Sequence, residues 1–118
     1  MLIIAALLLV LCGLVHSILG EHYILRRLFK RDNLPQLFGS DQFTKGTLRF
    51  AWHITSLALF GFAALLVLMP DAKILLFTVS IVFAGSGIFS AYYTRGKHLS
   101  WLVFGVISAL TLARAMGA

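Results

Sequence analysis

Long apolar stretches alternate with short polar ones along the whole chain of 118 residues. Four apolar stretches, at residues 2–19, 48–69, 74–93 and 99–113, contain no Lys, Arg, Asp or Glu until their ends. Each comes close to the roughly 20 helical residues that cross a hydrocarbon core about 30 Å thick. Because peptide groups find no water in lipid, each stretch pairs its own backbone groups best as a helix. The pattern predicts an all-α integral membrane protein with four spans in a single domain over residues 1–118.

Short connections predict how these helices are arranged. Residues 70–73 and 95–98 are the only links between the last three stretches, so those stretches should be antiparallel neighbours. Small residues recur at helical spacing in the last two stretches, which lets helices approach closely in lipid. They are Ser80, Ala84, Gly87 and Ala91 in the third, and Gly105, Ala109 and Ala113 in the fourth. We therefore expect a four-helix up-and-down bundle in which the last two helices form a close hairpin.

The long connection from Gly20 to Thr47 is too apolar for a free loop. Between residues 21 and 31, apolar and basic residues alternate in pairs, which gives a helix one apolar face and one cationic face. Pro35 should end it, because the residue before a proline is pushed out of the helical region. We predict an amphipathic cytoplasmic helix at about residues 21–31 that rests on lipid headgroups. The residues expected to contact headgroups are Arg26, Arg27, Lys30, Arg31 and Arg49.

Composition and charge agree with this class. The chain is 60% hydrophobic and 12% charged, with a mean hydropathy of +0.96, values typical of membrane proteins. Most of the ten Lys and Arg residues lie in the first and third connections, and such residues are enriched on the cytoplasmic side. We predict a bacterial inner-membrane protein with both termini periplasmic. The net charge of +6 then reflects membrane anchoring, and nucleic acid is not an expected partner.

Other expected partners follow from the same features. Anionic lipids should meet the basic connection, and the small-residue stripes offer a face to a membrane-protein partner or to a homo-oligomer. Aromatic residues near the cytoplasmic ends of the spans are predicted to form an interfacial belt. They are Trp52, Tyr92, Tyr93 and Trp101.

Two histidines lie inside apolar stretches, where an apolar residue would cost less. His16 lies four residues before Gly20, which follows the first stretch, and His53 lies five residues after Leu48. At about 1.5 Å per residue, both sit roughly 6–8 Å below the cytoplasmic boundary. Ionisable residues at such depth usually face the interior of a bundle. Glu21 and His98 lie near the same end, so the sequence predicts a cluster.

The leading hypothesis is that this cluster binds a metal ion or a cofactor. Zn or Fe could be held by His16, Glu21, His53 and His98. Haem could take axial nitrogens from His16 and His53 alone. The chain has no His-x-x-x-His or Glu-x-x-His pair that would be specific for either. His16 and Glu21 are about 140° apart around a helix, so they converge only if Gly20 interrupts it.

Other functions remain open. Imidazoles that titrate near neutral pH also suit a proton-coupled or small-solute transport component. A scaffold or accessory subunit of a membrane complex is a third hypothesis. For His16 and His53, a structural role as hydrogen-bonding groups between helices has the same weight as a functional one. Catalysis ranks below binding, because Ser17 and His16 point about 100° apart on a helix. Whether the protein is an enzyme is therefore left open.

Two short patterns carry a resemblance. They are His16, Ser17, Leu19, Gly20 and Glu21, and then Leu48, Arg49, Phe50, Ala51, Trp52 and His53. In these positions the chain resembles a family of small four-span bacterial inner-membrane proteins to which no activity is assigned. The resemblance implies that His16, Glu21 and His53 matter together, and it implies nothing about a substrate.

Overall fold

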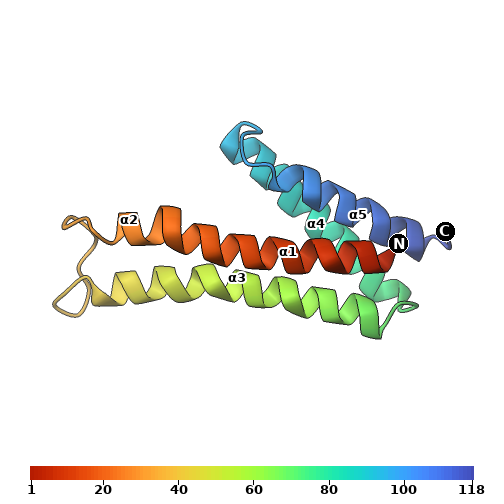
Figure 1. The fold of residues 1–118 in the computed structure, drawn as a ribbon, viewed down its shortest axis with the longest axis horizontal. Coiled ribbons are helices and arrows are strands. Elements are labelled where there is room, and N and C mark those ends of the chain that lie inside the picture. The colour runs from red at the N-terminus through yellow and green to blue at the C-terminus, as the bar shows by residue number, and fades with distance from the viewer. The chain divides into compact units, whose positions relative to one another are not determined.

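The computed structural model describes all 118 residues, and its regular structure is helical (Figure 1). The elements are α1 (Leu2–Gly20), the π-helical turn η1 (Glu21–Leu25), α2 (Arg26–Leu28), α3 (Gln42–Leu68), α4 (Lys73–Thr94) and α5 (Ser100–Ala115). Outside the helices, one isolated antiparallel bridge joins Leu37 and Ser40. The all-α fold class predicted from the sequence is confirmed.

Three helical stretches are long and apolar enough to cross a membrane. They are Leu2–Leu28, Gln42–Leu68 and Lys73–Thr94, while α5 is apolar but only 16 residues long. The second stretch begins at Gln42 rather than at residue 48. This extension has a local cause, because the Ser40 hydroxyl accepts a hydrogen bond from the Gln42 N–H at 3.3 Å. A free amide at the helix start is thereby satisfied.

The chain forms two compact units. Unit 1 contains Met1–Val10 and Phe60–Ala118, and unit 2 contains Leu11–Leu59. Within unit 2, α1 and α3 run antiparallel, since Glu21 of the first helical stretch pairs with Arg49 while the earlier Ser17 pairs with the later Ser56. All the polar contacts of the site described below lie in unit 2.

In unit 1, α4 and α5 form a close antiparallel hairpin, as the short connection predicts. The backbones approach most closely at Gly87, where an added Cβ would lie 3.4 Å from the carbonyl oxygen of Trp101. The hydroxyls of Ser80 and Ser108 lie 3.0 Å apart across the same contact. Hydrogen bonds between helices have few competitors in lipid, so this pair holds the register of the hairpin.

The face of α5 that packs differs from the predicted one. Gly105 and Ala109 are exposed, and a Cβ at Gly105 would meet nothing within 4 Å. The buried residues are Ile107, Thr111 and Ala115. Larger side chains make more van der Waals contacts than small ones, and the Thr111 hydroxyl can be buried because it bonds to the Ile107 carbonyl at 2.9 Å. On this helix, the face that packs is therefore the one whose side chains make more contacts, and not the one that would let the backbones approach most closely.

Aromatic rings fill the centre of unit 1. Phe83 of α4 is buried and meets Phe62 of α3 and Phe104 of α5 edge-on, with ring centroids 5.6 and 5.2 Å apart. Edge-to-face pairs at this separation are favourable beyond the area they bury. At one end of the unit, an ion pair joins Asp71 in the α3–α4 turn to Arg114 near the end of α5. These contacts tie parts of three helices together.

The segment after α1 corrects a second expectation. The sequence predicts a separate amphipathic helix at residues 21–31, whereas η1 and α2 continue α1 directly and the helix ends at Leu28. Gly20 keeps helical angles, φ −62° and ψ −45°, so nothing interrupts the helix at that point. Lys30 and Arg31 belong to the turn that follows. The basic residues of this segment are exposed, as an interfacial role requires.

Candidate functional site

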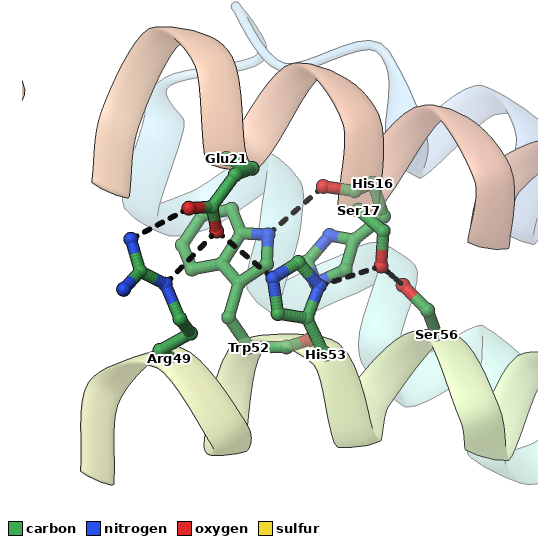
Figure 2. Close-up of polar contacts among 7 residues, drawn as sticks. All are labelled: His16, Ser17, Glu21, Arg49, Trp52, His53 and Ser56. Atoms are coloured by element: carbon green, nitrogen blue, oxygen red, sulfur yellow. Dashed lines mark hydrogen bonds and ion pairs between the residues drawn. The ribbon is translucent and has the colours of Figure 1, made fainter. Parts of the chain in front are cut away.

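Polar side chains of unit 2 gather where α1 and η1 face α3 (Figure 2). Residues four apart share one face of a helix, and four such pairs meet here. They are His16 with Gly20, Ser17 with Glu21, Arg49 with His53, and Trp52 with Ser56. Because the two helices are antiparallel, each side chain finds its partner on the opposite helix.

Glu21 is held by two residues of α3. Its carboxylate accepts hydrogen bonds from Arg49 Nη2 at 2.6 Å and Arg49 Nε at 3.3 Å. The same carboxylate lies 2.9 Å from His53 Nε2. A two-bond pair between arginine and a carboxylate fixes the orientation of both groups. The guanidinium carbon of Arg49 also lies 4.9 Å from the centroid of the Phe29 ring. This cation–π contact favours the position in which Arg49 bonds to Glu21.

The His53 ring links Glu21 to two serine hydroxyls. Its Nδ1 lies 2.8 Å from Ser17 Oγ, and the Ser17 hydroxyl donates to Ser56 Oγ at 2.6 Å. Ser56 is 3% exposed, whereas the side chain of Glu21 is 21% exposed. A continuous run of short hydrogen bonds therefore connects a partly exposed carboxylate with a buried hydroxyl (Figure 2).

His16 packs against Trp52. The two rings are stacked, with centroids 4.7 Å apart and planes 4° from parallel. Two hydrogen bonds reinforce the contact: Trp52 Nε1 donates to the His16 carbonyl at 2.9 Å, and His16 Nε2 lies 3.0 Å from the Trp52 carbonyl. Gly20 leaves room for the indole, because a Cβ there would lie 2.1 Å from Trp52 Nε1.

The π-helical turn η1 begins at Glu21. Its wider turn is closed by the Arg26 N–H, which bonds to the carbonyl of Glu21 five residues earlier. Single π-helical turns inside helices are frequent at functional sites, where they change the aim of neighbouring side chains. Here the turn starts at Glu21, whose side chain bonds to residues of α3. It directly follows the part of α1 where His16 and Gly20 pack against the Trp52 ring.

The structure brings part of the predicted cluster together. His16 Nε2 contacts the carbonyl of Trp52, the residue before His53, and Glu21 contacts the His53 ring. Arg49 pairs with Glu21, an arrangement that the four-residue spacing of Arg49 and His53 indicates. His98 belongs to unit 1, where its Nδ1 accepts a hydrogen bond from the Ser100 N–H at 3.3 Å.

No group of three or more His, Cys, Asp or Glu side chains is arranged to hold a metal ion. This finding does not support the predicted ligand set of His16, Glu21, His53 and His98. The reason lies in the hydrogen bonds: His16 Nε2 is turned to the Trp52 carbonyl, and both ring nitrogens of His53 face protein oxygens. Haem ligation by His16 and His53 stays a prediction.

Three members of the site were not predicted as such. The sequence predicts Trp52 as part of an interfacial belt, and it indicates no partner for Ser17 and no role for Ser56. The sequence signal that identifies them is a spacing of four residues. Ser17 precedes Glu21 by four residues, and Trp52 precedes Ser56 by four. Arg49 and His53 have the same spacing. Polar residues repeated at this spacing on two apolar helices indicate a polar contact line between them.

Comparison with protein-family models, with curated proteins and with solved structures finds no match. The resemblance to small four-span bacterial inner-membrane proteins therefore stays a prediction.

Proposed function

We propose that this chain is a small multi-pass membrane protein whose polar cluster relays protons, as a component of proton-coupled transport. The observation that carries the proposal is the unbroken run of hydrogen bonds from Glu21 through His53 and Ser17 to Ser56, with links of 2.9, 2.8 and 2.6 Å. Imidazole is the side chain that exchanges protons most readily near neutral pH. A proton-exchanging ring thus stands between a partly exposed carboxylate and a buried hydroxyl.

The direction of the hydrogen bonds suggests how a proton would move. The Ser17 hydroxyl donates to Ser56, so the Ser17 oxygen is left to accept from His53 Nδ1. With Nε2 directed to the Glu21 carboxylate, both nitrogens of the ring then have an oxygen that can accept a proton. Loss of one proton from His53 would let the Ser17 hydroxyl turn from Ser56 to Nδ1. Proton exchange at the ring is then coupled to rotation of one hydroxyl.

Arg49 supports this arrangement by orienting the carboxylate. Its two hydrogen bonds fix both oxygens of Glu21, and the oxygen bonded to Nε is also the one that faces His53. Arginine stays charged at all physiological pH values, so it does not take part in the exchange itself. We therefore assign Arg49 as a positioning residue and Glu21, His53 and Ser17 as the relay.

The proposed location is a bacterial inner membrane, with the relay in its cytoplasmic half and both termini periplasmic. Exposed cations follow α1 directly, at Arg26, Arg27, Lys30 and Arg31. Basic residues flanking a span favour the cytoplasmic side. Glu21 would then face the cytoplasm, and Ser56 would lie deeper in the membrane.

Proton flux into liposomes tests the proposal. The purified protein is reconstituted with a pH-sensitive dye inside, and a potassium gradient with valinomycin drives proton movement. We expect a flux above that of protein-free liposomes, and we expect His53→Gln and Ser17→Ala to lower it at least tenfold. The reason is that each substitution removes one link of the hydrogen-bonded run from Glu21 to Ser56.

Matched variants separate a relay from a purely structural role. His22→Gln changes an exposed histidine whose ring meets only Tyr23, and Thr55→Val changes a hydroxyl that bonds to its own helix at the Ala51 carbonyl. Both should keep the flux of the unchanged protein. A reconstituted protein that conducts no more than empty liposomes, or variants His53→Gln and Ser17→Ala that fold and conduct normally, would refute the relay.

A further inference from the structure

The connection between α2 and α3 ends in a tight turn that displays an aromatic ring. The Leu37 N–H bonds to the Ser40 carbonyl at 2.9 Å, which closes the turn over Phe38 and Gly39. Both central residues have positive φ, 57° and 88°. Glycine adopts such angles freely, but for a bulky residue like phenylalanine they are rare. The backbone therefore holds Phe38 in a conformation that a local preference would not produce.

The ring of Phe38 is the most exposed large apolar side chain of the chain, at 89%. Its one aromatic contact is the edge of Phe43, whose side chain is also exposed, as is that of Leu37. The turn is anchored from behind, because the Thr44 hydroxyl donates to the Pro35 carbonyl at 2.7 Å. A fixed apolar tip of three side chains thus projects from the connection.

Basic residues flank this tip along the chain. Residues 26–49 contain six basic side chains, at Arg26, Arg27, Lys30, Arg31, Lys45 and Arg49, against two acidic ones, at Asp32 and Asp41. The difference, six minus two, is a net charge of +4. Arg49 is paired with Glu21 and Lys45 with Asp41, whereas Arg26 and Lys30 are exposed and form no ion pair. Positive charge around an apolar tip is complementary to a surface of anionic phospholipid.

We propose that the turn of Leu37, Phe38, Gly39 and Ser40 is a membrane-inserting wedge, with Phe38 in the acyl boundary and the neighbouring cations on anionic phospholipid headgroups. The wedge lies in the connection between two stretches that are long and apolar enough to span the membrane, Leu2–Leu28 and Gln42–Leu68. The ends of these stretches would hold the wedge at that boundary. A headgroup layer of opposite charge explains why an aromatic ring is exposed among cations. The wedge is independent of the proton relay.

Fluorophore depth measurements test the wedge. In a Cys12→Ser background, Phe38→Cys and Gln36→Cys are each labelled with an environment-sensitive fluorophore, and the full-length protein is placed in lipid nanodiscs. Gln36 is an exposed polar neighbour and serves as the matched position. We expect the label at position 38 to be quenched by lipids that carry a nitroxide on the acyl chain, at least threefold more than the label at position 36. Aqueous iodide should quench them in the opposite order.

Lipid composition tests the headgroup part. Acyl-chain quenching at position 38 should be greater in phosphatidylglycerol than in phosphatidylcholine, and Arg26→Gln with Lys30→Gln should remove that difference. Equal quenching in both lipids would overturn the role of the anionic headgroups. A label at position 38 that iodide reaches as fully as the label at position 36, in anionic nanodiscs, would overturn insertion itself and leave a protein partner as the occupant of the tip.

Discussion

Gly20 is the residue on which the contact between α1 and α3 in unit 2 depends most directly. The indole of Trp52 occupies the space that any side chain at this position would need. We expect Gly20→Ala to lower the free energy of unfolding by about 1–3 kcal/mol, the usual cost of overpacking a well-packed contact. Circular dichroism during denaturation in mixed micelles measures the change.

Gly46 provides the matched control for this substitution. It lies in α3 with nothing within 4 Å of an added Cβ. Gly46→Ala should leave stability unchanged or raise it by up to about 1 kcal/mol, because alanine is the better helix former. If Gly20→Ala is as stable as Gly46→Ala, the indole does not need the space that the structure gives it.

Single residues also show where sequence reasoning works and where it stops. Counting residues along two apolar helices predicts similar depths for His16 and His53, and each of them bonds to a residue of the other helix. Their partners could not be counted in this way, because the direction of a side chain depends on how each helix is rotated about its axis. The His16 ring stacks on Trp52, whereas the His53 ring contacts Glu21 and Ser17.

At the scale of elements, the α4–α5 hairpin makes a prediction about packing. Phe83 is buried between Phe62 and Phe104, whereas Phe89, two turns further along α4, is exposed. Phe83→Ala should destabilise the protein by up to about 3 kcal/mol, because a cavity remains, although lipid supplies no additional transfer term. Phe89→Ala should have little effect in the same denaturation assay. Equal losses for both variants would contradict the central position of Phe83.

Helix boundaries illustrate what periodicity can and cannot predict. Apolar length alone identifies the four helices, since each must satisfy its backbone in lipid. It does not reveal that α3 begins at Gln42, because the cause is one side-chain hydrogen bond from Ser40. It also does not reveal the π-helical turn, because the pattern of apolar and basic residues after Gly20 fits an α-helix equally well. Small residues mark the close approach at Gly87 but not the packed face of α5.

For the whole molecule, the distribution of basic residues predicts orientation. In a Cys12→Ser background in bacterial cells, a membrane-impermeant maleimide should label Ala118→Cys in intact cells and Asn33→Cys only after permeabilisation. Both positions are exposed, so accessibility within the protein does not decide the result. The reverse pattern would turn the molecule over in the membrane and place Glu21 on the periplasmic side.

The brevity of α5 has a consequence for the surrounding bilayer. Its 16 residues extend about 24 Å, some 6 Å less than an average hydrocarbon core. A helix shorter than the core thins the nearby lipid or draws flanking polar residues inward, at a cost that grows with each ångström. In a membrane of mixed chain lengths, short-chain lipids would then collect along α5, so the protein would select its own annulus on that side.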